Sequence, residues 1–134
     1  MRAPIAGLTS FFVLGLAVCP SHALDLNTFR AQHKKPPLAY SAALAGAAHA
    51  HARDLARRNQ LDHKDFRQRV GTLASTAAEN VLYGCETEDC AIRMWAKSSG
   101  HRRNMLMNGV SRYGIASARA ENGRHYCVMV LGSE

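Results

Sequence analysis

The sequence has few aromatic residues and no long apolar run outside its N-terminal segment. Phe, Trp and Tyr make up 7% of the 134 residues, while 47% are hydrophobic and 20% are charged. This is the composition of a globular protein, and it excludes a disordered, collagen-like or coiled-coil chain. A single apolar run at the N-terminus excludes a polytopic membrane protein. No internal repeat, low-complexity tract or long linker follows that run, so the length predicts one domain.

The N-terminal run has the three parts of a removable signal peptide. Arg2 supplies the positive charge, residues 8–18 the apolar core, and residues 21–23 (Ser-His-Ala) a small-x-small cleavage site. The core is too short to span a bilayer comfortably. We therefore predict a cleaved signal peptide over residues 1–23 and a secreted or periplasmic protein with no transmembrane span after cleavage. A lipobox at residues 16–19 is the alternative, although its valine is larger than the residue usually found before the lipidated cysteine.

Positive charge exceeds negative charge in the mature chain. With residues 1–23 removed, 111 residues remain and the formal net charge falls from +7 to +6, because Arg2 leaves. A basic surface favours anionic partners such as cell-wall polymers or lipid headgroups. Export argues against nucleic acid as the partner. We therefore expect an anionic ligand that is extracellular or part of the cell envelope. We also expect the protein to be a monomer.

Three cysteines remain after cleavage, which is an odd number for an oxidising compartment. Cys85 and Cys90 enclose only four residues, so they are the favoured disulfide pair. Cys127 lies in a predicted strand and is then a buried free thiol. A bond from Cys127 to either of the other two stays open, because connectivity cannot be deduced from sequence. The cysteines lack the second closely spaced ligand pair of a zinc finger.

Hydrophobic periodicity predicts helices in the first three quarters of the mature chain. The expected helices cover residues 26–33, residues 42–59 with Ser41 as N-cap, a segment from residues 87–89 to 99–100, and residues 101–106. In the long second helix, one stripe is expected to be buried and the opposite stripe solvated. The buried stripe contains Leu44, Ala47, Ala48, His51 and Leu55, and the solvated one contains His49, Arg53 and Arg57.

The C-terminal segment changes to strand character. Residues 113–119 and 125–131 are expected as strands, and Asn122-Gly123 between them predicts a hairpin turn. Residues 71–78 are expected as a loop. Helices first and a strand pair last predict an α+β fold, in which helices cover an antiparallel sheet.

Six histidines in the mature chain suggest a metal site, but most have a plainer explanation. His51 is on the buried stripe and is expected to be a packed core histidine. His63 and His101 differ, because they lie in a polar loop and at a helix start. Glu79 follows two alanines in an apolar stretch, so we expect it to be partly buried beside a partner. The remaining three are expected to be ordinary surface or partly buried side chains: His33, His49 and His125.

Three motifs occur in a fixed order along the chain. They are residues 78–84 (Ala-Glu-Asn-Val-Leu-Tyr-Gly), residues 95–106 with Trp95, Ser98, Gly100-His101-Arg102, Asn104 and Leu106, and residues 113–116 (Tyr-Gly-Ile-Ala). Together they resemble the CAP superfamily, which is named for cysteine-rich secretory proteins, antigen 5 and pathogenesis-related proteins. The earlier Asp62-His63, Asn27-x-x-Arg30 and Pro37-Leu38 fit as well. The match covers the mature chain, so residues 24–134 are expected to be one short bacterial CAP (SCP-like) domain.

The resemblance implies an α-β-α sandwich, in which helices flank a small antiparallel sheet. It also implies a surface cleft in which His63, His101 and Glu79 come together. Larger eukaryotic members have a second cleft glutamate, which is missing here because residues 95–98 are Trp-Ala-Lys-Ser. Ala78 also stands where the family usually has glycine.

Two imidazoles and one carboxylate match a zinc-type site with an open water position. We therefore predict His63, Glu79 and His101 as ligands of a metal ion, with zinc as the cofactor, in a secreted binding module. The alternatives are a metal-assisted hydrolase that uses a cleft-bound water, and a hydrogen-bonded cluster that only orders the cleft. The absence of a second acid or base and of a motif-placed serine or cysteine nucleophile favours binding over catalysis. Lipid binding is disfavoured, because no long apolar loop could build a tunnel.

Overall fold

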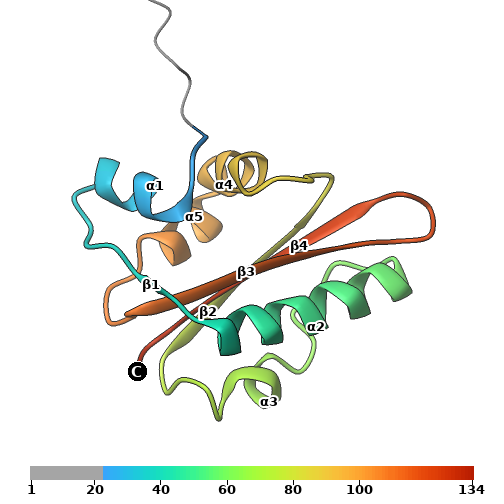
Figure 1. The fold of residues 1–134 in the computed structure, drawn as a ribbon, viewed down its shortest axis with the longest axis horizontal. Helices are drawn as coiled ribbons and strands as arrows, with labels where there is room; N and C mark the ends of the chain where they lie inside the picture. Colours follow the sequence, from blue (N-terminus) through green and yellow to red (C-terminus); the bar gives the residue numbers. More distant parts are fainter. Residues whose placement is uncertain (1–22) are drawn as a thin grey trace, which may run out of the picture.

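The computed structural model describes residues 23–134, so the predicted signal peptide lies outside the described residues apart from Ala23. Figure 1 shows the order of the elements. They are α1 (Leu26–Gln32), β1 (Ala39–Tyr40), α2 (Ala42–Arg58), α3 (Phe66–Val70), β2 (Ala77–Tyr83), α4 (Glu88–Ala96), α5 (Ser99–Met105), β3 (Arg112–Arg119) and β4 (His125–Gly132). Over this part of the chain, no helix combines the length and the apolar character needed to cross a membrane.

The strands form one sheet in the order β1-β3-β4-β2. β4 is central and pairs antiparallel with both β3 and β2, while the two-residue β1 runs parallel to β3. The predicted hairpin is confirmed, since β3 and β4 pair from Arg112 with Gly132 to Arg119 with His125. Gly123 in its turn has a φ of +84°, a conformation that favours glycine. The sheet is mixed rather than purely antiparallel, because β1 adds one short parallel pair.

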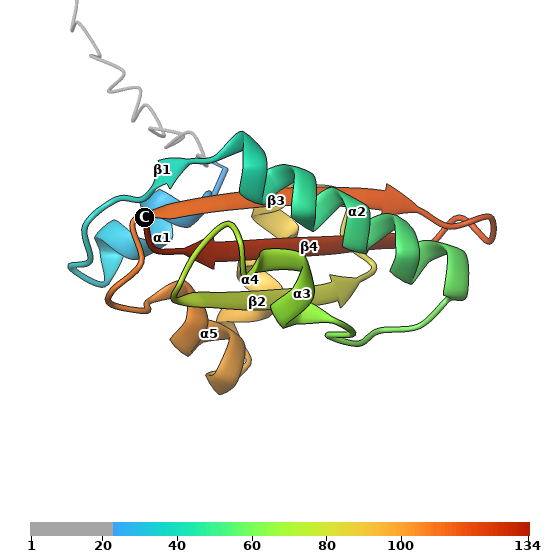
Figure 2. The ribbon, with the colours of Figure 1, turned by 90° about the horizontal axis from the view of Figure 1, so that it is seen from below.

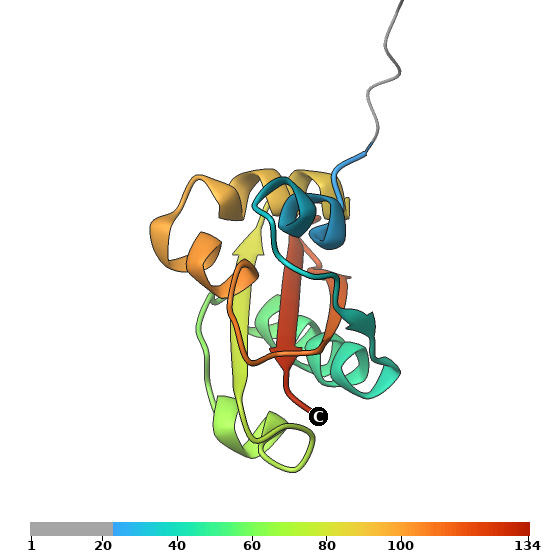
Figure 3. The same cartoon turned by 90° about the vertical axis from the view of Figure 1, so that its left-hand side faces the viewer.

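Helices cover both faces of the sheet, which gives three layers (Figures 1 and 3). α2 and α3 lie on one face, and α1, α4 and α5 lie on the other. The central strand β4 supplies both cores in alternation: Tyr126, Val128 and Val130 pack on the α2 side, and Cys127, Met129 and Leu131 pack on the α4 side. A strand that is buried on both faces shows a continuous apolar run, as residues 126–131 do. The predicted α+β fold and α-β-α sandwich are confirmed.

The prediction of a loop over residues 71–78 is wrong for its last two residues, because β2 begins at Ala77. β2 is buried from Ala78 to Leu82, yet it contains Glu79 and Asn80. These two polar residues interrupt the apolar run that would have indicated a buried strand. β2 also lies at the edge of the sheet beside α3 and α5, as Figure 2 shows. The polar pair in this edge strand is therefore where the candidate site begins.

α2 begins and ends where the sequence predicts. The Ser41 hydroxyl accepts a hydrogen bond from the Leu44 backbone N–H at 3.2 Å, and Asn59 ends the helix in the left-handed region, with a φ of +50°. The predicted solvated side chains of α2 are exposed, and of the predicted buried stripe only Ala47 is half-buried. α2 approaches the sheet very closely, since a Cβ added to Gly114 of β3 would lie 2.0 Å from the Ala45 nitrogen.

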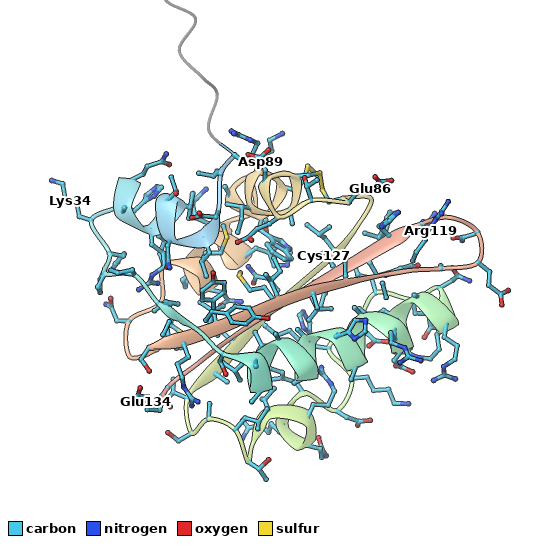
Figure 4. All side chains as sticks on the ribbon, viewed as in Figure 1. Lys34, Glu86, Asp89, Arg119, Cys127 and Glu134 are labelled. Atoms are coloured by element: carbon cyan, nitrogen blue, oxygen red, sulfur yellow. A yellow bond between two sulfur atoms is a disulfide. The ribbon has the colours of Figure 1, made fainter. Side chains whose placement is uncertain are left out.

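The predicted disulfide is confirmed. Cys85 and Cys90 are bonded at the start of α4, with their Cα atoms 5.5 Å apart (Figure 4). Cys127 is a free, buried thiol in β4, also as predicted. Burial raises the pKa of this thiol to about 12, so it is protonated and unreactive at neutral pH.

Candidate functional site

Glu79 of β2 lies at the centre of a group of basic side chains. α2, the loop after it and α3 place three of them around the carboxylate, and α5 places a fourth beside the outer edge of β2. We call this group the Glu79 cluster; it consists of His51, His63, Arg69, Glu79 and His101. It is built from segments that are far apart in the sequence, and β2 is the element on which they meet.

Arg69 of α3 holds the Glu79 carboxylate at both oxygens. Its Nη1 donates to Oε2 at 2.6 Å and its Nη2 donates to Oε1 at 3.0 Å, while its Nε donates to the Lys64 carbonyl at 2.9 Å. Glu79 is only 5% exposed, and a buried carboxylate needs partners of this kind. A guanidinium provides two parallel donors in the geometry that a carboxylate accepts. Glu79 is therefore buried and partnered as expected, but its main partner is an arginine that the sequence analysis missed.

His63 also contacts Glu79 directly. Its Nδ1 lies 2.9 Å from Oε1, and because a carboxylate can only accept, the proton is on Nδ1. The His63 side chain is 51% exposed, so Nε2 is the ring atom left for a ligand. Glu79 thus sets the orientation and the tautomer of His63, as carboxylates commonly do for functional histidines.

The loop that carries His63 is held firmly in place. The Asp62 carboxylate accepts from Nη1 of Arg58 at 2.8 Å and from Nη2 at 3.2 Å, and these bonds lower the pKa of Asp62 to about 2. His51 is 2% exposed, as predicted for a core histidine, and it donates from Nε2 to the Asp62 carbonyl at 2.9 Å. The same Nε2 lies 3.8 Å from Oε1 of Glu79. His51 is therefore both a packed residue and a support of the loop.

His101 reaches the cluster from the opposite side of the edge strand. Asn80 donates from Nδ2 to the His101 carbonyl at 3.0 Å, and Asn104 donates from Nδ2 to Oδ1 of Asn80 at 2.9 Å and to the Glu79 carbonyl at 3.3 Å. These bonds fix α5 to β2. Burial lowers the pKa of His101, and the charge of His63 lowers it further, so the two imidazoles are within electrostatic reach of each other.

The structure therefore brings His63 and Glu79 into contact, and it fixes the backbone of His101 to β2 through Asn80. In residues 23–134, the ion-pair contacts of Glu79 are to His51, His63 and Arg69, and His101 makes none with it. Arg69 had no signal in the sequence, because the five-residue α3 has no visible periodicity of its own. His51 could have been recognised as a neighbour of Glu79 only by knowing that the loop after α2 folds back over it.

The predicted metal ligands do not fit a metal ion as they are folded. Both oxygens of Glu79 accept from Arg69, and Oε1 also accepts from His63. Across the described residues, no three His, Cys, Asp or Glu side chains are placed to hold a metal ion. The guanidinium would in addition repel a cation at the carboxylate. Zinc binding by His63, Glu79 and His101 stays a prediction, and it requires that Arg69 first release Glu79.

The surface around the cluster is basic. The two segments that carry His63 and His101, residues 61–70 and 97–106, contain six Lys or Arg and two Asp. Of the two aspartates, Asp62 is neutralised by Arg58. The exposed cations nearest to the histidines in the chain are Lys64, Arg67, Arg102 and Arg103.

A separate hollow of about 590 Å³ lies between α2 and the β3–β4 hairpin. None of its lining residues belongs to the Glu79 cluster, and two of its charged side chains, Asp54 and Arg57, pair with each other. The hollow is lined by charged side chains, but unlike the cluster it has no buried charged group among the described residues that line it. The Glu79 cluster is the stronger candidate site.

Comparison with known proteins agrees with the fold. The model of the family "CAP: Cysteine-rich secretory protein family" matches residues 25–131. The chain is 28% identical over 97 residues to the uncharacterized protein YkwD of Bacillus subtilis (strain 168), a match that covers 66% of this chain and 38% of that protein. The chain thus spans well under half the length of this curated relative.

Two solved structures are similar over 81% of the chain. An outer surface protein from Borrelia burgdorferi has a TM-score of 0.72 at 16% identity, with 86% of that chain covered. An extracellular protein containing an SCP domain, from Bacillus anthracis str. Ames, has a TM-score of 0.71 at 21% identity, with 38% of that chain covered. With a family model that matches nearly all of the described residues, the chain belongs to the CAP, or cysteine-rich secretory protein, family.

Proposed function

We propose that this chain is a secreted binding module, which holds an anionic ligand with His63 and His101. The observation that carries the proposal is the Arg69–Glu79 pair, because it neutralises the one carboxylate of the cluster. The groups left for a ligand are then two imidazoles in a basic surface. Export is supported by the N-terminal sequence pattern and by relatives that are described as extracellular or outer surface proteins.

Protonated imidazoles suit a phosphate or carboxylate group. His63 is held through Nδ1, so that its Nε2–H can donate outward, and His101 is held through its backbone on α5. Charge-assisted hydrogen bonds from two such donors are stronger than neutral ones. The exposed Lys64 and Arg102, each next to a histidine in the chain, would raise the local concentration of an anion.

Such binding would take up protons. In the free protein the pKa of His101 is lowered by burial and by His63, whereas a bound anion would raise it. The affinity for an anion should therefore increase as the pH falls through the ordinary histidine range, around 6.5.

The test is a titration with sodium phosphate and with a glycerol-phosphate oligomer at pH 6, followed by NMR of the imidazoles. Both His63 and His101 should shift, and His63→Ala or His101→Ala should each weaken binding by about tenfold, the effect of losing one hydrogen bond to a charged group. His49→Ala is the matched control, because His49 is exposed on α2 and outside the cluster. An unchanged affinity in the variant that carries both His63→Ala and His101→Ala would overturn the proposal.

The same samples should be titrated with zinc chloride. Saturable zinc binding that is lost in His63→Ala and in His101→Ala would support the metal prediction in place of the anion proposal. The metal-assisted hydrolase alternative requires that result as its first condition.

A further inference from the structure

We infer that Arg69 determines the ligand class of the Glu79 cluster: its guanidinium occupies the position beside Glu79 where a divalent cation would bind, and its removal would create a metal site. This inference goes beyond the proposed function. It rests on that proposal only in assuming that the ligand binds at this cluster. The inference depends on which atoms Arg69 occupies, and on what those atoms could bind without it.

The donor atoms around Arg69 already have a separation that suits a metal. Nδ1 of His63 and Oε1 of Glu79 are 2.9 Å apart, in a hydrogen bond whose Nδ1 proton a metal ion would have to replace. Two ligands at about 2.0 Å from a tetrahedral zinc are roughly 3.3 Å apart, so a small movement would let both bind one ion. Nη2 of Arg69 donates to the same Oε1 at 3.0 Å, so the oxygen that such an ion would need is already hydrogen-bonded to the guanidinium.

Arg69 is placed as a fixed part of the cluster and not as a mobile surface side chain. Its guanidinium uses three nitrogens, two on Glu79 and one on the Lys64 carbonyl, and its side chain is 18% exposed. Because the Lys64 carbonyl is next to His63, the same guanidinium holds the histidine loop and neutralises the carboxylate. A cation could bind both oxygens of Glu79 only by displacing the two hydrogen bonds from Arg69 and by overcoming its positive charge.

A neutral side chain at position 69 removes both obstacles. Arg69→Met keeps much of the length of the aliphatic stem, loses the guanidinium that lies over the Phe66 ring, and leaves Glu79 with His63 and His51. Glu79 is then a buried carboxylate without a countercharge, and a divalent cation is the partner that would compensate it. His101, across the edge of β2, is the next side chain available as a ligand.

The experiment is zinc binding by calorimetry at pH 7.5 to the wild-type chain and to Arg69→Met. The variant should bind zinc about 10- to 100-fold more tightly than the wild type, which is the size of effect that groups adjoining a metal ligand have on affinity. Arg69→Lys keeps the charge and should stay near the wild type. Arg67→Met is the matched control, since it removes the same charge from an exposed position on α3.

Two further variants keep the inference testable if Arg69→Met does not fold. Arg69→Gln, which keeps an amide donor for Glu79 but has no charge, should also gain zinc affinity. Adding His63→Ala to either neutral variant should abolish the gain, because His63 is the proposed second ligand. Wild-type zinc affinity equal to that of both neutral variants would overturn the inference, whatever the phosphate titration shows.

Discussion

Arg30 and Glu79 are two ionic side chains that the fold buries, and each is satisfied in a different way. Arg30 is 1% exposed and donates to backbone carbonyls: from Nε to Pro36 at 2.9 Å, and from Nη1 to Met105 at 2.8 Å and Met107 at 3.2 Å. The Met105 carbonyl belongs to the last residue of α5, where a positive charge is stabilising. Glu79 instead has a guanidinium and an imidazole. Both solutions support α5 and β2, the elements that position the candidate site.

His101 should titrate below the ordinary histidine pKa of 6.5, because it is partly buried and faces the charge of His63. The folded protein then binds fewer protons than the unfolded chain between the lowered value and 6.5. The His101 contribution to stability is therefore complete above pH 6.5 and is lost as the pH falls toward the lowered value. Imidazole NMR against pH measures this directly.

The variant His63→Asn separates the two causes of the lowered pKa of His101, which are burial and the charge of His63. It should raise the pKa of His101 toward 6.5 without restoring it fully, since burial remains. A His101 that titrates at or above 6.5 in the wild type would contradict this account.

At the scale of elements, the outer edge of β2 is covered by side chains and not by another strand. The indole Nε1 of Trp95 donates to the Val81 carbonyl at 3.3 Å, and Asn104 donates to the Glu79 carbonyl. Such cover protects an edge strand from pairing with other chains. It also explains why Trp95, Asn80 and Asn104 occur together in the motifs: they attach α4 and α5 to the strand that carries Glu79.

Asn80→Ala should destabilise the protein by about 1–3 kcal/mol, because it leaves the His101 carbonyl without its donor and removes one of the two acceptors of the Asn104 amide. The amides of α5 should exchange faster with solvent, and His101 should become easier to protonate. Urea unfolding and hydrogen exchange measure both effects. Asn108→Ala, which removes an exposed amide bonded to Lys35, should change stability by less than about 0.5 kcal/mol.

Gly114→Ala and Gly46→Ala should have opposite effects. A Cβ at Gly114 would lie 2.0 Å from the Ala45 nitrogen and 2.5 Å from its Cα, so α2 would have to move off the sheet. We expect a loss of about 3 kcal/mol or more, as for severe overpacking of a core. Gly46 is in the solvent-facing part of α2 with nothing within 4 Å of a Cβ, so alanine there should stabilise the helix by about 0.5–1 kcal/mol. Thermal and urea unfolding compare the two; equal effects would refute the close contact of α2 with β3.

For the whole molecule, the disulfide and the N-terminal contacts act on the same region. The Leu24 backbone N–H donates to Oδ1 of Asp89 at 2.5 Å, and that of Leu26 donates to Oε1 of Glu88 at 3.2 Å. The start of the described chain is thus attached to the first turn of α4, which the Cys85–Cys90 bond also ties to the end of β2. These hydrogen bonds and the disulfide therefore tie the start of α1, the start of α4 and the end of β2 together at one end of this layer.

Replacing both Cys85 and Cys90 by serine should lower the free energy of unfolding by about 2 kcal/mol, the entropic effect expected for a loop this short. Urea unfolding of the oxidised wild type and of the variant gives the difference. Thiol labelling of the wild type should modify Cys127 only after unfolding, because it is buried with a pKa raised to about 12. Rapid labelling of the native protein, or a mass map that links Cys127 to another cysteine, would contradict this arrangement.

Local patterns in the sequence were sufficient for the features that depend on neighbouring residues. Ser41 predicted the start of α2, Asn122-Gly123 predicted the hairpin, and the short spacing of Cys85 and Cys90 predicted their bond. Each of these depends on a cap, a turn or a loop closure within a few residues. The motif order extended this to the family, and with it to the three-layer fold.

Only the tertiary structure decided the chemistry of the site. β2 was hidden by its own polar residues, and Arg69 became the main partner of Glu79 because α3, the loop after α2 and the edge strand meet at one place. A sequence names the residues that can pair, but the partner of a buried carboxylate is the donor that packing brings within about 3 Å. Since three elements must be in place before that donor is known, no local pattern could have chosen the arginine over the histidines.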